Sequence, residues 1–372
     1  MAKAKKKLLP KDFENQLKTC DFDALKSIFD TCDVNARGGV FKQTALAFNE
    51  CPDELARWLV EQGADLSAGD SYGETPLHAR ARNWQGRIDV LLELGADVHQ
   101  GEGGRGTPLH FAAAVGNCDT AQLLLQHGAR VDALNGDNLT PLAYALQRCS
   151  NAQIENMAAM AELLVNAGAN KPLKPKGLFT RVFGSGGAKP SGSSADIKTF
   201  IQRIGTDFEF HRSNFNPEML DATSAALEKL YFLFGVAPVP RRAIYDGKSA
   251  IVANTKRWQD QHQELWELLV PSSGAAGTVQ GEVIRIPGKI RDELEGNGGV
   301  NWDSDYEKMA DAFLTHVGSG VKLPDREFAE ARTIVGEVKG RRGDTERMCE
   351  LAVNWVALNP KPMKLSTPIY SR

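Results

Sequence analysis

A short motif that recurs four times in the first half of the chain constrains the fold more than any other feature. The four copies read Thr-Ala-Leu-Ala, Thr-Pro-Leu-His, Thr-Pro-Leu-His and Thr-Pro-Leu-Ala, and they begin at Thr44, Thr75, Thr107 and Thr140. An apolar stretch and a Gly-Ala pair follow each copy, at Gly63, Gly95, Gly128 and Gly168. Self-similarity at a fixed period of this size is typical of stacked repeats, so we expect a solenoid.

Each copy also has the local chemistry of a helix pair. A threonine can cap the first helix with its side chain, and proline suits the first turn, where a backbone N–H has no partner to lose. Glycine after the second helix suits a left-handed C-cap. Because one helix pair cannot bury its apolar face alone, stability must come from stacking neighbouring pairs.

The motif, at spacings of 31, 32 and 33 residues, resembles the ankyrin-repeat family. The resemblance covers residues 11–170 as about five units. The unit at Thr44 is worn, because Asn49, Glu50 and Pro52 stand where small residues and helix formers are expected. The unit at Thr140 carries about seven extra residues around 147–157. The resemblance implies a structural role for the signature histidines and binding of another protein by the array.

The rest of the chain divides by composition. We expect a basic disordered tail at residues 1–10, a linker rich in Pro, Gly, Ser and basic residues at 171–195, and a mainly helical domain of unrecognised family at 196–372. Apolar spacings of three and four predict its helices near 196–210, 218–234, 254–270, 278–295, 303–317, 325–339 and 344–358. Pro287 predicts a kink or a division of the fourth helix. The predicted fold class is all-α.

Charge and cysteine usage exclude several classes of protein. The formal net charge of −3 disfavours general nucleic-acid binding, although the lysines of the tail and the basic linker keep a local contact open. The sequence has neither a secretory signal nor an apolar stretch long enough to span a membrane. Six scattered cysteines suit reduced thiols in the cytoplasm, and we expect no cofactor, metal or catalytic residue.

Residues of the array that neither pack nor cap are the candidates for contacting a partner. They should lie on the concave helix face and the loop tips, where aromatic and arginine side chains dominate interface energetics. Packing of Trp84 and Phe111 against the next repeat is an open alternative. The candidates are Tyr72, Arg82, Trp84, Glu102, Arg105, Phe111, Val115, Asp137, Tyr144, Gln147 and Arg148.

A polar stretch in the second half gives the other candidate site. Glu282, Arg285, Lys289 and Glu293 recur at helical spacing, which is typical of a solvated row of ion pairs. The alternative is a cleft with Glu282 as acid or base and two aspartates as metal ligands, although a capping box beginning at Ser304 explains part of that turn. The candidate cluster is Gln280, Glu282, Arg285, Asn301, Asp303 and Asp305.

Two functions follow as hypotheses. The leading one is a non-enzymatic adaptor or inhibitor that binds a partner protein through the array, in one form a bacterial immunity or antitoxin-type protein that occludes a toxin. The alternative is an enzyme or effector that the array directs to its substrate and that uses Glu282, Arg285, Asp303 and Asp305. The sequence indicates neither the partner nor the oligomeric state.

Overall fold

The computed structural model describes residues 4–169, 194–243 and 245–372, which form two compact units. Within these residues the first unit takes in Met1–Asp207 and Pro217–Val239, and the second takes in Phe208–Asn216 and Pro240–Arg372. The predicted linker lies almost wholly outside the described residues. The predicted domain division at 171–195 stays a prediction, because contacts group the first two helices after that segment with the repeats.

The N-terminal unit of the array combines two helices with a small sheet. Helices α1 (Phe13–Thr19) and α2 (Phe22–Thr31) bury Phe13 and Phe29 against each other, with ring centroids 6.2 Å apart. Strand β2 (Cys32–Gly38) lies between β1 (Lys6–Leu8), which is parallel to it, and β3 (Gln43–Thr44), which is antiparallel. The predicted disordered tail is therefore wrong at Lys6–Leu8, because these residues satisfy backbone groups of β2.

The second repeat of the array, which begins at Thr44, is worn, as predicted. Its first helix is reduced to the single 3-10 turn η1 (Ala45–Ala47), and α3 (Asp53–Glu61) begins after Pro52. The turn ends at Phe48 in extended backbone, and Pro52 disfavours helical backbone at Cys51, so the turn does not run on into α3. Leu46 and Leu55 remain fully buried, so the unit keeps its apolar stacking face.

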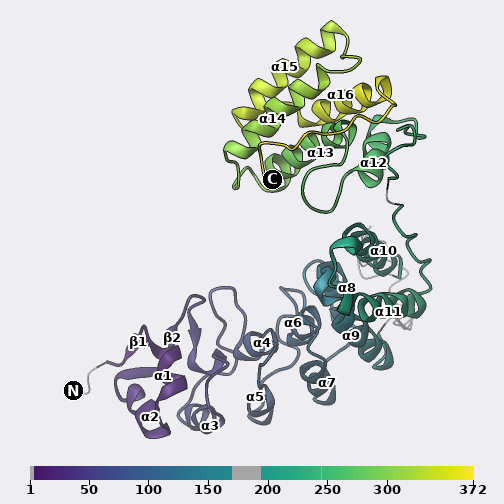
Figure 1. Cartoon of the computed structure of the whole chain (residues 1–372). Coiled ribbons are helices and arrows are strands. Elements are labelled where there is room, and N and C mark those ends of the chain that lie inside the picture. Colours follow the sequence, from purple (N-terminus) through teal and green to yellow (C-terminus); the bar gives the residue numbers. More distant parts are fainter. Residues whose placement is uncertain (1–3, 170–193, 244) are drawn as a thin grey trace, which may run out of the picture. The chain divides into compact units, whose positions relative to one another are not determined.

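Three complete helix pairs follow, and Figure 1 shows them side by side in sequence order. They are α4 (Pro76–Ala81) with α5 (Asp89–Glu93), α6 (Pro108–Val115) with α7 (Cys118–Gln126), and α8 (Pro141–Arg148) with α9 (Ile154–Asn166). Each second helix ends before a glycine with positive φ, as the sequence predicted.

The signature histidines link neighbouring repeats. Thr107 N–H donates to His110 Nδ1 at 3.0 Å, so Nε2 carries the proton and donates to the Leu139 carbonyl of the next loop at 3.0 Å. His78 makes the same bonds with Thr75 and with the Gln100 and Gly106 carbonyls. Burial lowers the pKa of His110 to about 4, which keeps the imidazole neutral. The predicted structural role of both histidines is confirmed.

The extra residues of the last repeat lie beside the helices that follow the linker. They form η2 (Asn151–Gln153) and the start of α9, whose 13 residues exceed the nine of α7. Arg203 of α10 (Ser194–His211) donates from Nη2 to the Leu146, Gln147 and Cys149 carbonyls at 3.0 to 3.2 Å. The C-terminal end of α8 is thus capped by a side chain from beyond the linker.

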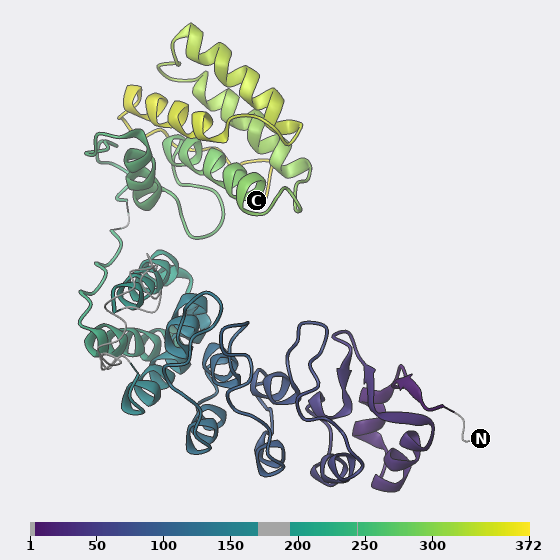
Figure 2. The ribbon, with the colours of Figure 1, turned by 180° about the vertical axis from the view of Figure 1, so that it is seen from behind.

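Helix α11 (Pro217–Phe234) completes this cover, and Figure 2 shows the same arrangement from behind. Thr223 Oγ1 donates to Glu155 of α9 at 2.7 Å, and Lys229 pairs with Glu162 at 2.6 Å. The short turn η4 (Arg212–Asn214) separates α10 from α11. Because a terminal repeat otherwise exposes its stacking face, α10 and α11 act as the C-terminal cap of the solenoid.

The second unit is built around α13 (Val279–Arg291), whose residues are buried almost continuously. The other helices are α12 (Trp258–Leu269), the π-helix η5 (Asp292–Gly296), α14 (Ser304–Val317), α15 (Asp325–Lys339) and α16 (Thr345–Leu358). These bounds match the predicted helices closely. Helix α13 runs through Pro287 without dividing, because the apolar side chains of α12, α14 and α16 hold it on all sides.

The fold class is all-α, with the small N-terminal sheet as an addition. Among the described helices, none combines the length and the apolar character that crossing a membrane requires. The six cysteines are free thiols.

Candidate functional site

Six of the eleven array candidates gather on the loops and first helices of three repeats. Tyr72 and Arg105 lie on successive loops, Arg82 ends α4, and Phe111, Tyr144 and Arg148 lie on α6 and α8. The contacts described below join them into one continuous surface. We call this surface, which consists of Tyr72, Arg82, Arg105, Phe111, Tyr144 and Arg148, the arginine–aromatic face.

The buried carboxylate of Glu74 anchors two arginines of this face. Glu74 directly precedes the N-cap Thr75 and is only 3% exposed, whereas Arg82 and Arg105 are 37% and 56% exposed. Arg82 Nη2 pairs with one carboxylate oxygen, and Arg105 Nε lies 3.2 Å from the other. A buried carboxylate is costly unless paired, so Glu74 fixes both arginines in place.

Each arginine of the face also covers an aromatic ring. The guanidinium carbon lies 4.6 Å from the ring centroid for Arg105 over Tyr72, 4.8 Å for Arg82 over Phe111, and 5.2 Å for Arg148 over Tyr144. The Phe111 and Tyr144 rings meet edge to face at 6.4 Å. Stacking on a ring leaves the edge of a guanidinium, which carries its N–H donors, free to meet a planar acceptor.

Arg105 and Arg148 both lie within electrostatic reach of Arg82. Burial is the main cause that lowers the pKa of Arg82, and the charges of Arg105 and Arg148 lower it further. Three guanidinium groups against the one carboxylate of Glu74 leave an excess of positive charge, although Asp70 nearby acts in the opposite sense. The face is therefore an electropositive patch on an acidic chain.

Of the other five candidates, Trp84, Glu102, Val115 and Gln147 have no contact with this face among the described contacts. Trp84 is 54% exposed, so about half of its surface is open to solvent, whereas Phe111 is 6% exposed and packs against Tyr144 of the next repeat. Glu102 pairs with Arg130 of the next loop at 3.0 Å. Val115 is half-buried at the end of α6, and Asp137 and Gln147 are exposed. Their role in binding stays a prediction.

Two members of the site were not predicted. Glu74 stands next to the repeat signature, where the sequence shows only a charged residue in a loop. Phe41, whose ring centroid lies 6.0 Å from that of Tyr72, belongs to the worn repeat, where the register is weak. The available signal for Glu74 is a carboxylate directly before the cap, followed by Arg82 two turns later and by Arg105 in the loop before the next signature.

The polar cluster of the second unit surrounds the C-terminal segment of the chain. Gln280 is fully buried and holds the start of this segment. Its Nε2 donates to the carbonyls of Asn359 at 2.9 Å and Lys361 at 2.7 Å, and its Oε1 accepts from Met363 N–H at 3.0 Å. An amide side chain thus replaces the backbone partner that this irregular segment lacks.

Glu282 and Arg285 form a buried ion pair one turn further along α13. Arg285 Nη2 and Nε donate to the two oxygens of Glu282 at 2.6 and 2.9 Å, and both residues are at most 1% exposed. Tyr370 Oη donates to Glu282 Oε1 at 2.7 Å, and Arg285 Nη1 donates to the Arg372 carbonyl at 2.6 Å. Burial acts to raise the pKa of Glu282, but the bonds and charge of Arg285 outweigh it and the pKa is lowered.

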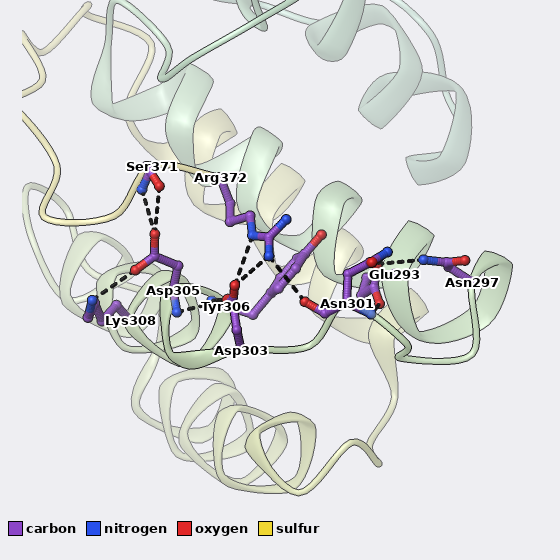
Figure 3. A network of polar contacts seen from close by, with 9 residues as sticks. All are labelled: Glu293, Asn297, Asn301, Asp303, Asp305, Tyr306, Lys308, Ser371 and Arg372. Atoms are coloured by element: carbon purple, nitrogen blue, oxygen red, sulfur yellow. Dashed lines mark hydrogen bonds and ion pairs between the residues drawn. The ribbon is translucent and has the colours of Figure 1, made fainter.

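Asn301, Asp303 and Asp305 hold the end of the same segment (Figure 3). Asp303 pairs with Arg372, and Asp305 Oδ2 accepts from Ser371 N–H and Oγ at 3.0 and 2.8 Å. The Asn301 carbonyl accepts from Arg372 Nη2 at 3.4 Å. Asp303 is also the N-cap of α14, accepting from Asp305 N–H at 3.0 Å. The predicted capping box at Ser304 is therefore wrong by one residue.

The predicted solvated row of charges is also wrong. Glu282 and Arg285 are buried, and Glu293, which is 5% exposed, accepts from Asn297 Nδ2 at 3.1 Å and from Asn301 N–H at 2.5 Å. Lys289 alone of the four predicted residues is exposed. These side chains are buried because α13 lies at the centre of its unit. A charge pattern that is typical of a surface helix therefore occurs on a buried one.

The chemistry of the cluster follows from its partners. All six predicted residues contact residues 359–372, and the carboxylates of Glu282, Asp303 and Asp305 already accept bonds from Tyr370, Ser371 or Arg372. No group of three or more metal-ligating side chains occurs in the described ranges. A substrate at this cluster would have to displace the C-terminal segment first.

Comparison with known proteins agrees with the repeat architecture. The family described as ankyrin repeats (three copies) matches residues 84–174, which contain α5 and the two complete helix pairs that follow it, α6 with α7 and α8 with α9. No curated protein matches the chain. Ankyrin arrays are protein-interaction modules, so the array of this chain is a module for binding another protein. The chain is an ankyrin-repeat protein.

Proposed function

We propose that the arginine–aromatic face binds an acidic segment of a partner protein, and that the chain acts as an adaptor or inhibitor. The observation that carries the proposal is the pairing of Arg82 and Arg105 with the buried Glu74, which positions two guanidinium groups before any partner arrives. Arginine matches carboxylates with two parallel N–H bonds, and an arginine held in advance loses less entropy on binding.

The composition of the face fits a peptide or loop that carries both carboxylates and apolar side chains. The rings of Tyr72 and Tyr144 offer apolar contact beside Arg105 and Arg148, and Tyr72 is 53% exposed. Tyrosine and arginine are enriched among the few residues that dominate interface energies. A basic partner would be repelled by the excess positive charge.

Inhibition by occlusion is the form of this function that we favour. A face of fixed side chains on a rigid solenoid can cover a partner's active surface without chemistry of its own, as an immunity or antitoxin-type protein would. The alternative, an enzyme that uses Glu282, Arg285, Asp303 and Asp305, has less support, because the C-terminal segment accounts for the bonds of these side chains.

A paired set of variants tests the proposal. In the Arg105→Ala/Arg148→Ala variant the face loses two charges but keeps the Arg82–Glu74 pair. The matched control Arg57→Ala/Arg87→Ala removes two other exposed arginines of the same array, which pair with Glu93 and Asp53. Full-length proteins serve as baits in native cells, with partners quantified by mass spectrometry and affinities measured on the purified pair.

We expect the face variant to weaken partner binding by at least about tenfold, because two interface arginines are lost, and the control to bind like the wild type. Affinity of the wild type should fall as salt rises. A partner retained equally by both variants, or one whose contacting segment is basic, contradicts the proposal.

A further inference from the structure

Residues 370–372, at the end of the C-terminal segment, are held mainly through their side chains. The phenol of Tyr370, the hydroxyl of Ser371 and the guanidinium group of Arg372 each donate to a different carboxylate. Side chains more often bond to backbone groups or water, so three such bonds in consecutive residues indicate a fit between particular side chains. We call Tyr370–Arg372 the tip and the residues that contact it the tip site, which consists of Glu282, Arg285, Asn301, Asp303, Asp305 and Tyr306.

The two ends of the tip meet different chemistry in the tip site. At one end, Tyr370 Oη lies 2.7 Å from Oε1 of the buried Glu282. At the other end, Arg372 Nε lies 3.2 Å from Asp303 Oδ2, and the guanidinium carbon lies 5.4 Å from the ring centroid of Tyr306 (Figure 3). A carboxylate beside a ring suits a planar guanidinium group, which can stack and donate at the same time. The tip site therefore fits an aromatic residue, a hydroxyl residue and an arginine in this order.

The charge of the tip site matches a basic residue. Two of its three carboxylates already have a cation of the second unit, because Arg285 pairs with the buried one and Lys308 Nζ lies 2.8 Å from Asp305 Oδ1. The third carboxylate, that of Asp303, pairs with Arg372 of the tip. Without the tip, this carboxylate would lack its cation, and the site would attract a basic segment in place of the tip.

The span before the tip is a loose tether. No hydrogen bond joins residues 366–369 to the rest of the described chain, whereas residues 359–363 are held by the buried Gln280. The side chains of the Arg372–Asp303 pair are 40% and 43% exposed. Exposed ion pairs contribute little to stability, because water competes for both charges. The tip can therefore leave its site while the start of the C-terminal segment stays in place.

Contacts within the second unit order the tip site independently of the tip. Glu282 and Arg285 are bonded to each other through two N–H···O bonds of 2.6 and 2.9 Å. Asp303 is the N-cap of α14, and the Tyr306 ring stacks on Trp302 with centroids 5.1 Å apart and planes at 13°. A site that is ordered before its ligand arrives loses less entropy on binding.

We propose that the tip site binds a basic segment of a partner protein, one that carries an aromatic residue, a hydroxyl residue and an arginine in this order, and that the tip occupies the site until such a segment displaces it. The tip is the example of this chemistry within the chain, and Asp303 supplies the charge that selects the arginine. A short tether gives the tip an effective concentration on the order of millimolar, so a partner segment that binds more tightly replaces it. This site belongs to the second unit and does not depend on binding by the array.

Fluorescence anisotropy of a labelled, blocked Pro-Ile-Tyr-Ser-Arg peptide with the full chain tests the proposal. The Tyr370→Ala/Arg372→Ala variant releases the tip, and the matched control Lys364→Ala/Ile369→Ala changes two exposed residues of the same segment. In the released variant, a further Asp303→Asn substitution removes the selecting charge, and asparagine remains a good N-cap for α14. A second peptide, with glutamate in place of its arginine, tests the requirement for a basic residue.

We expect the released variant to bind the arginine peptide at least about tenfold more tightly than the wild type and the control variant do, because the tip no longer competes. Asp303→Asn should weaken this binding by about tenfold, and the glutamate peptide should not bind. Equal binding by the released variant and the wild type, or equal binding after Asp303→Asn, overturns the proposal. A wild-type dimer that is lost in the released variant, seen by sedimentation velocity, would identify a second copy as the occupant and overturn the assignment to a partner protein.

Hydrogen exchange of the wild type tests release of the tip without any variant. The Ser371 amide donates to Asp305 at 3.0 Å, and the Met363 amide donates to Gln280 at 3.0 Å. Because the tip leaves alone, the Ser371 amide should exchange at least about tenfold faster than the Met363 amide, relative to their intrinsic rates. Equal protection of the two amides would mean that the tip leaves only when the unit unfolds, which also overturns the proposal.

Discussion

The two units satisfy their buried polar groups over different distances along the chain. In the array, His78 reaches the Gln100 and Gly106 carbonyls, 22 and 28 residues away, so each repeat completes its neighbour. In the second unit, Gln280 and Glu282 bond to Met363 and Tyr370, 83 and 88 residues away. Stability in the array therefore accumulates between neighbours, whereas the second unit depends on closure by a distant segment.

The largest expected effect concerns this closure. Replacing Arg285 by Leu leaves Glu282 buried without its charge partner, which typically costs about 3 to 5 kcal/mol. We expect urea to unfold the second unit of this variant much earlier while the array keeps its midpoint. Hydrogen exchange read separately on α13 and α6 measures the difference, and the exposed Arg326→Leu of α15 is the control. If hydrogen-exchange protection of α13 were unchanged in Arg285→Leu, the second unit would not depend on this buried ion pair, and the proposed difference between the two units would be wrong.

The pH dependence of the array should come mainly from its buried histidines. The folded pKa of His110, about 4, lies below the usual value of 6.5, so between these values the unfolded chain binds the proton more strongly. The contribution of His110 to the free energy of unfolding is therefore fully present above pH 6.5. It is lost as the pH falls to 4, which lowers that free energy by about 2 to 3 kcal/mol. Urea titrations at pH 7.5 and 4.5 should show a smaller pH effect on the array in His110→Gln, and an equal effect contradicts the assignment.

An effect of intermediate size is expected at the C-terminal cap formed by α10 and α11. Arg203→Met deprives three carbonyls at the end of α8 of a charged donor, which typically costs about 1.5 to 3 kcal/mol. Because repeats are coupled to their neighbours, we expect exchange to rise in α8 and α9 and to fade toward α3. Lys198→Met, which removes an exposed cation of the same helix, is the control. A uniform rise in exchange along the array would contradict the idea that each repeat is stabilised mainly by its neighbours.

The same contrast explains what could be predicted from the sequence. The repeat register sorted packing from free positions in the array, and helical spacing located the helices of the second unit. The sequence also marked Gln280, Glu282 and Arg285 as chemically unusual, but their partners follow α16 by irregular backbone that no periodicity signals. Local patterns likewise could not show that α13 is central, so a buried ion pair resembled a surface row.

The smallest expected effect separates binding from folding in the array. Trp84 is 54% exposed, and Asn117 Nδ2 donates to its backbone carbonyl at 3.0 Å rather than to its side chain. Trp84→Ser should therefore shift the free energy of unfolding by at most about 0.5 kcal/mol, as is usual for exposed positions. A urea titration beside that of Tyr72→Ser, which removes a ring under Arg105, measures both. If Trp84→Ser were as destabilising as a core substitution, its indole would belong to the packing between repeats and not to the surface available for a partner.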